Sequence, residues 1–186
     1  MNFNSHLELE GRHAFLSASK YHWLRYDDEK LANSYRTAVM AQKGTELHDL
    51  AATLIRMGVR LPQTRQTLNK YVNDAIGFRM TPEQPLFYSR NAFGTADAIS
   101  FRKNFLRIHD LKTGVNPAKF DQLLIYAAFF CLEYEIKPST IKVELRLYQN
   151  DDVSVHIPEL DELVHTMDRV VSANKVVEAM RQEEYE

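Results

Sequence analysis

The chain has 186 residues, 45% of them hydrophobic and 26% charged, which fits a single globular domain that buries its own core. Its one cysteine, Cys131, excludes an intrachain disulfide, a cysteine-rich zinc site and a four-cysteine iron–sulfur cluster, and favours a reducing, cytosolic environment. The net charge of −2 is uneven, because residues 1–120 carry 17 Lys and Arg against 11 Asp and Glu, while residues 121–186 carry 6 against 14. This asymmetry fits a basic face beside an acidic tail, and it fits scattered solvated charge equally well.

The start of the sequence has no basic region followed by an apolar stretch, the pattern typical of a secretory signal. The longest apolar run, around Leu123–Leu132, is well short of the roughly 20 residues that cross a bilayer. We therefore expect neither export nor a membrane span.

The N-terminal portion, about residues 1–80, is predicted to be helical. Ser17 or Ser19 can accept a backbone N–H as the cap of a first helix that runs through Trp23. A second, polar helix is expected over residues 28–42.

Two further helices are expected before the sheet. Gly44-Thr45 opens one that Gly58 ends, and its apolar face is formed by Leu47, Leu50, Ala51 and Leu54. The next covers Pro62–Gly77, with inward-facing Leu68, Val72, Ala75 and Ile76.

Strands are predicted from about residue 81. One begins at Pro85, and two more, Gly94–Phe101 and Phe105–Lys112, are joined by the polar turn at residues 102–104. A helix over Pro117–Glu135 follows.

The rest of the chain continues the alternation of strand and helix. Ile141–Tyr148 alternates apolar residues on one face, Val153–Ile157 fits an edge strand, and a last helix follows Pro158. The order predicts an α/β fold, a mixed central sheet flanked by helices with an N-terminal helical portion. We expect one domain over residues 1–186, with a core at about 81–157 and a C-terminal helix at about 158–186.

The most informative residues are Asp110 and Lys112 at the end of the third predicted strand. Period-two geometry places both on the face that Leu106 and Ile108 bury further back. Asp97, on the preceding antiparallel strand, can lie opposite the end of this one. Two converging carboxylates suit Mg²⁺ or Mn²⁺, and a neighbouring lysine can orient a water or stabilise a pentacovalent phosphorus. The same residues also fit purely structural roles. Asp110 and Lys112 can be a surface Asp-x-Lys pair at a strand end, and Asp97 can be a cap after a turn.

His48 is a third candidate, one helical turn before Ala51 and Ala52. As a lone histidine it fits a hydrogen-bonded, partly buried side chain. Beside Asp97 and Asp110 it becomes a candidate ligand through a neutral ring nitrogen.

Gln122 and Tyr126 lie one turn apart on the helix that follows the Asp-Leu-Lys strand. Gln122 can donate to a phosphate or a water, and Tyr126 can donate to a phosphate or stack on a base. Packing in the core among Leu123, Ala127 and Phe130 is the alternative for Tyr126.

The series Gly44-x-x-x-His48, Gly94-x-x-Asp97, Asp110-x-Lys112-Thr113-Gly114 and Gln122-x-x-x-Tyr126 resembles the motifs of the RecB-like PD-(D/E)XK nucleases. Members include RecB and AddB-type nuclease domains and stand-alone exonucleases of phages and CRISPR systems. The resemblance spans Gly44–Tyr126 and extends weakly to the segment around Ser17 and Trp23.

The resemblance implies a restriction-endonuclease-like core and a metal-dependent DNA nuclease, with an exonuclease favoured. It implies that His48, Asp97 and Asp110 bind Mg²⁺ or Mn²⁺ with the Leu111 carbonyl, and that Asp97, Asp110 and Lys112 are catalytic. Gln122 and Tyr126 would position substrate. The implied partner is DNA, single-stranded or at duplex ends, with a homo-oligomer or a recombination protein as further partners, and the implied location is the cytoplasm of a bacterial or phage-infected cell.

The sequence departs from the family at Tyr26, which stands near the place of an iron–sulfur cysteine in several relatives. The later cluster cysteines are also absent, so no iron–sulfur cluster is expected. The motor domains that make helicase-fused relatives processive are missing as well.

A second function is a catalytically silent nuclease-fold module that acts through a protein partner as a recombination accessory or inhibitor. An acidic C-terminal surface could serve that role, formed by Asp161, Glu162, Glu178, Glu183, Glu184 and Glu186. A binding fold, however, has no physical need for a histidine, two aspartates and a lysine together. A zinc hydrolase or nucleobase deaminase is not expected, because the single cysteine cannot supply the Cys-x-x-Cys pair of such a zinc site. The predicted helices also carry four cations that can either contact the phosphate backbone or simply be solvated charges: Arg56, Arg60, Arg65 and Lys70.

Overall fold

The computed structural model describes residues 14–183, and the chain divides into two units, residues 1–45 and 46–186. The division falls inside helix α1 (Asp28–Met57). The first unit also contains a 3₁₀ helix, η2 (Ala18–Arg25), whose N-cap Ser17 accepts from the Ser19 N–H at 3.3 Å. The predicted cap at Ser17 is confirmed, and the helix it starts is 3₁₀ rather than α.

Helix α1 runs without a break through Gly44, so the two separate helices predicted over residues 28–42 and from Gly44 are one. A glycine inside a helix costs about 1 kcal/mol relative to alanine, and the strong helix formers around it offset this. Gly58 takes the left-handed conformation, φ +68°, directly after the helix, as its predicted role as a helix stop requires.

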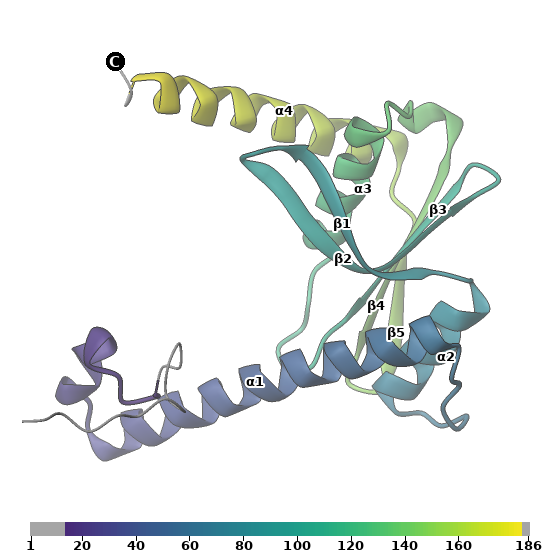
Figure 1. The fold of residues 1–186 in the computed structure, drawn as a ribbon. Coiled ribbons are helices and arrows are strands. Elements are labelled where there is room, and N and C mark those ends of the chain that lie inside the picture. The colour runs from purple at the N-terminus through teal and green to yellow at the C-terminus, as the bar shows by residue number, and fades with distance from the viewer. Residues whose placement is uncertain (1–13, 184–186) are drawn as a thin grey trace, which may run out of the picture. The chain divides into compact units, whose positions relative to one another are not determined.

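The second unit is built around a five-stranded sheet in the order β1-β2-β3-β4-β5 (Figure 1). All neighbouring strands are antiparallel except β3 and β4, which are parallel. The predicted mixed sheet is confirmed. Its elements are α2 (Thr67–Gly77), β1 (Thr81–Ser89), β2 (Ala92–Arg102), β3 (Phe105–Leu111), α3 (Asp121–Glu133), η3 (Pro138–Thr140), β4 (Lys142–Gln149), β5 (Asp152–His156) and α4 (Leu160–Glu183).

Apolar side chains are buried on both faces of the sheet. One cluster joins α3 and α4 to residues such as Leu106, Ile108 and Leu145. The other joins the end of α1 and α2 to Ala98, Leu111 and Tyr148. Since neighbours along a strand point to opposite faces, β3 is buried on both sides, as a strand covered by helices on both faces must be.

Three element starts lie four or five residues from the prediction. Helix α2 begins at Thr67 rather than Pro62, because residues 62–66 form a loop held by Asn69, whose amide donates to the Pro62 carbonyl at 3.0 Å. Strand β1 begins at Thr81 rather than Pro85, and helix α3 at Asp121 rather than Pro117. In residues 14–183, no helix combines the length and apolarity that crossing a membrane requires.

Candidate metal centre

Strand β3 carries its apolar alternation directly into a charged residue. Leu106, Ile108 and Asp110 follow one another at period two, and each is at most 1% exposed. The parallel pairing with β4 extends past the strand, because the Lys112 N–H donates to the Tyr148 carbonyl at 2.9 Å. The fold therefore holds the Asp110 backbone rigidly between two neighbouring strands.

Three carboxylates lie in a row across β1, β2 and β3. The β2–β3 register ends at Ala98 opposite His109, so Asp97 comes opposite Asp110 at the next step. The Leu111 N–H donates to Asp97 Oδ2 at 2.8 Å, which fixes the Asp97 side chain at the end of β3. On the other side, Pro82 pairs with Ala98 and Gln84 with Ala96, so Glu83 stands opposite Asp97.

His48 reaches this row from the part of α1 that belongs to the second unit. One turn on, Ala51 packs into the cluster that contains Ala98, the residue after Asp97. His48 Nδ1 lies 3.3 Å from Asp97 Oδ2. One donor atom from each of His48, Glu83 and Asp97 lies within 4.8 Å of the other two, a spacing that can hold a metal ion.

The charges of this group are poorly balanced. Burial, then the charge of Asp97, raises the pKa of Asp110 to about 6. Burial, then Asp97, also raises the pKa of Glu83, and the hydrogen bond to Asp97 raises the pKa of His48. Asp110 Oδ2 is buried and has no hydrogen-bond partner, although Lys112 Nζ lies 3.0 Å away as an ion pair. Asp110 and Glu83 therefore hold their protons more tightly than free carboxyl groups do, first because they are buried and then because Asp97 brings a like charge beside them.

Lys112 connects the carboxylates to helix α3. Its ammonium donates to Asp110 Oδ1 at 3.2 Å and to Gln122 Oε1 at 2.7 Å. The Gln122 amide in turn donates to the Tyr126 hydroxyl at 3.1 Å. The polar residues predicted from β3 and α3 thus form one continuous chain of contacts.

Gly94 gives Tyr126 its position. A Cβ at residue 94 would lie 3.0 Å from Tyr126 Cε1, so any side chain there would push the ring away from β2 by a few tenths of an ångström. Tyr126 is half-buried and packs at the edge of the core cluster. The alternative of core packing is therefore confirmed in part, since the ring packs against the core while the hydroxyl joins the polar chain, and the contact of Tyr126 with substrate stays a prediction.

The structure brings together the side chains that the sequence nominated for metal binding and catalysis, and adds one. His48 and Asp97 are in contact, Asp110 and Lys112 are paired, and the Leu111 backbone bonds Asp97. The residue missed was Glu83. Counting back from the hairpin tip at residues 90–91 places Gln84 opposite Asp97, and the register shift between Phe87 and Ser89 gives that place to Glu83 instead. In addition, β1 was expected to begin only at Pro85.

The predicted phosphate-binding cations lie outside this group. Arg56, Arg60 and Arg65 are exposed, and the Arg56 charge acts on Glu83 by lowering its pKa. Lys70 Nζ donates to the Asp151 carbonyl at 2.7 Å, so it holds a turn of the protein.

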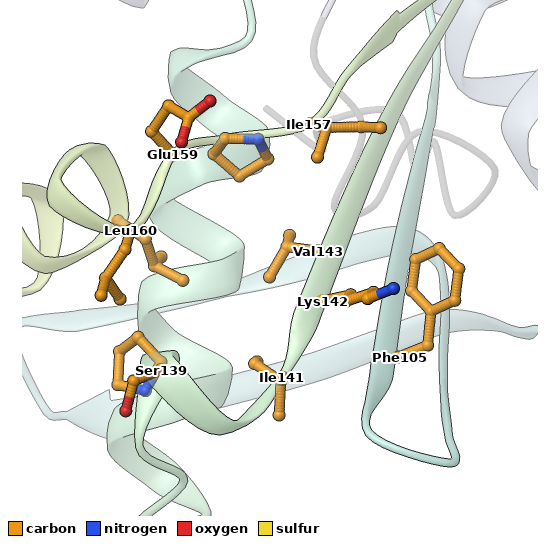
Figure 2. A pocket seen from close by; sticks show the side chains of 11 residues that line it. Phe105, Ser139, Ile141, Lys142, Val143, Ile157, Glu159 and Leu160 are labelled. Atoms are coloured by element: carbon orange, nitrogen blue, oxygen red, sulfur yellow. The ribbon is translucent and has the colours of Figure 1, made fainter.

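A separate pocket of about 460 Å³ lies at the opposite end of β3 and β4, near Phe105 (Figure 2). Its lining is mostly apolar, including Val143, Ile157 and Leu160, with Lys142 and Glu159 as its charged residues. It has neither converging carboxylates nor a histidine. This pocket therefore lacks the set of metal-ligand donors that is present at the Asp110 end of the sheet.

Comparisons of this chain with protein-family models, with curated proteins and with solved structures found no match.

Proposed function

We propose that this protein is a divalent-metal-dependent nuclease that hydrolyses DNA phosphodiester bonds, with an exonuclease favoured over a site-specific endonuclease. The carrying observation is the buried Asp110, which stands opposite Asp97 and is ion-paired to Lys112 at the end of β3. The motif resemblance to RecB-like PD-(D/E)XK nucleases supplies the substrate class and the preference for ends. No base-reading element is needed for such an activity.

The donor set fits Mg²⁺ or Mn²⁺. His48, Asp97 and Asp110 would hold the ion, and the Leu111 carbonyl is the further ligand that the resemblance implies. Glu83, Asp97 and Asp110 bring three negative charges against the one of Lys112, so a dication would neutralise the group when His48 is neutral. When bound, the ion lowers the pKa of an attacking water and offsets charge on the phosphate.

The chain's own residues supply orientation and a fixed positive charge. Lys112 is held by two acceptors, so its ammonium is already aimed at the carboxylate end where a phosphate would enter. There it would donate to the attacking water or to a non-bridging oxygen of the developing pentacovalent phosphate. Gln122 keeps both Lys112 and the Tyr126 hydroxyl in place, and Tyr126 contacts a phosphate or a base.

The test is a cleavage assay on end-labelled linear single- and double-stranded DNA with Mg²⁺, Mn²⁺ or EDTA. We expect metal-dependent degradation, lost to the level of the EDTA control in Asp110→Ala. Lys142→Ala is the matched control, because this exposed lysine lies at the other end of the sheet and should leave cleavage unchanged. Release of the label also gives the polarity of digestion.

Folded wild-type protein that cleaves neither substrate with either metal would contradict the nuclease. That result would favour the catalytically silent module that acts through a protein partner. Circular dichroism of each variant shows whether it is folded. A loss of cleavage caused by the missing side chain is thereby distinguished from one caused by unfolding.

A further inference from the structure

Glu83 has a backbone conformation that its residue type disfavours. Its φ is +50°, in the left-handed region, although it lies inside strand β1 and is not a glycine. Pro82 precedes it and is buried, and Pro85 follows two residues later. A strained residue of this kind persists only where the surrounding fold imposes it, and such residues cluster at functional sites.

The side chain of Glu83 meets a second unfavourable condition. It stands opposite Asp97 in the β1–β2 register, and like charges directly opposite in a sheet repel. Its carboxylate is nevertheless within 4.8 Å of donor atoms of both His48 and Asp97. Backbone strain and charge repulsion therefore coincide at one residue, and they bring a third ligand atom to the His48–Asp97 contact.

Asp110 provides an independent sign that a positive ligand belongs here. It is 1% exposed, and its Oδ2 atom is buried without a hydrogen-bond partner. It is the next carboxylate in the row, opposite Asp97. A buried carboxylate oxygen is normally hydrogen-bonded or bound to a cation, and here the one ammonium 3.0 Å away, that of Lys112, donates instead to Asp110 Oδ1 and Gln122 Oε1.

We infer that Glu83 is a metal ligand, and that with His48 and Asp97 it forms a position selective for a first-row transition dication over Mg²⁺. An imidazole nitrogen beside two carboxylates is a donor set that transition dications accept readily, whereas Mg²⁺ prefers oxygen ligands and retains its waters. The inference rests on the proposed function for its location at the end of β3. Asp97 lies between the two groups, because it is a ligand of this position and also stands opposite Asp110.

The probe is Mn²⁺, measured by loss of its free electron paramagnetic resonance signal on titration into the full chain after metals are stripped. We expect Glu83→Gln to weaken Mn²⁺ binding by about 10-fold or more, since even outer-shell changes at metal sites cost that much. Mg²⁺ binding, measured by calorimetry, should change by less than about 3-fold in the same variant. Glutamine keeps the shape of the side chain, and a thermal melt in EDTA checks the fold.

Asp49→Asn is the matched control, because Asp49 is an exposed acid next to His48 whose charge also acts on Glu83. It should leave Mn²⁺ affinity and stoichiometry unchanged. Wild-type affinity and stoichiometry in Glu83→Gln, or an equal loss in Asp49→Asn, would overturn the inference. Because the readout is binding, Glu83-dependent Mn²⁺ binding without DNA cleavage would refute the nuclease and leave this site standing.

Discussion

His109 and Asp110 are neighbours on β3, and a comparison of the two separates a structural polar group from a candidate cation site. They point to opposite faces of the sheet, and their exposed fractions are 0% and 1%. Each has one buried atom without a hydrogen-bond partner, Nε2 of His109 and Oδ2 of Asp110. By burial and hydrogen bonding alone, the two residues are alike.

The surroundings of His109 are aromatic and positively charged. Its Nδ1 is 3.2 Å from the Tyr148 hydroxyl, and its ring meets Phe78 edge to face at 5.6 Å between centroids. Burial, then the charges of Arg146 and Arg107, lowers the pKa of His109 to about 3. The side chain is therefore neutral at pH 7, in a place that repels cations.

The surroundings of Asp110 have the opposite sign. Asp97 and burial raise the pKa of its carboxyl, and the nearby cation, Lys112, only partly offsets them. A buried polar atom without a partner therefore does not by itself indicate a metal site. The sign of the charges around it decides which cluster attracts a cation and which is part of the core.

The largest effect we expect from this difference is on cleavage. Lys112→Met removes the ammonium beside Asp110 and should lower the rate of DNA cleavage by about 10³-fold, as the loss of a fixed transition-state charge does. Arg107→Met is the matched change on the His109 face, where Arg107 bonds Glu144 and stacks on Phe105. It should change the rate by less than about 3-fold. Equal losses in single-turnover assays would show that the two faces are not functionally distinct.

Much of this arrangement followed from local sequence rules. The period-two run of Leu106, Ile108 and Asp110 identified a strand whose buried face ends in an acid, and the short turn before Phe105 brought Asp97 opposite. The turn itself is two residues with positive φ, Lys103 and Asn104, which suits the twist of a hairpin. Short-range geometry was sufficient here because each step depends on neighbours in the chain.

The missed features depend on residues far apart in sequence. Glu83 lies between prolines, which weaken a strand signal, and only its pairing with β2 forces it into β1. The continuous α1 was missed because glycine is a weak helix breaker that its neighbours can override. His109 gave no sequence signal, since its neutral state follows from burial in the folded sheet and then from the charges of Arg146, on another strand, and Arg107.

The second effect is on stability without metal. The pKa of Asp110 is raised from 3.8 to about 6 in the fold, so its contribution to stability is present at low pH and is lost as pH rises through that window. Asp110→Asn mimics the protonated acid. It should raise the free energy of unfolding by about 3 kcal/mol at pH 7.5 and by about 1 kcal/mol at pH 4.5.

Urea unfolding in EDTA at the two pH values measures both differences. Addition of Mn²⁺ should stabilise the wild type more than the variant, because the variant keeps His48, Glu83 and Asp97 but lacks the Asp110 carboxylate whose negative charge the ion would also offset. A variant less stable than wild type at pH 7.5 in EDTA would mean that the ion pair with Lys112 outweighs the cost of burying the charge.

The smallest effect is expected at His109, and its pH dependence has the opposite sign. The folded pKa of about 3 lies below the ordinary 6.5, so the stability this group contributes is present above pH 6.5 and is lost as pH falls toward 3. His109→Leu should differ from wild type by no more than about 1 kcal/mol at pH 7.5, because it removes one long hydrogen bond and one unpartnered nitrogen together. At pH 5 the variant should gain about 2 kcal/mol relative to wild type.

Urea unfolding of metal-free protein at pH 7.5 and 5 gives both values, with His165→Leu as the control at an exposed position of α4. The control should follow the wild type at both pH values, since its side chain meets water in the folded and unfolded chain alike. If His109→Leu lost stability in parallel with wild type between pH 7.5 and 5, His109 would be charged in the fold. The positive surroundings of Arg107 and Arg146 would then not separate the two faces of β3, because a charged imidazole could persist beside them.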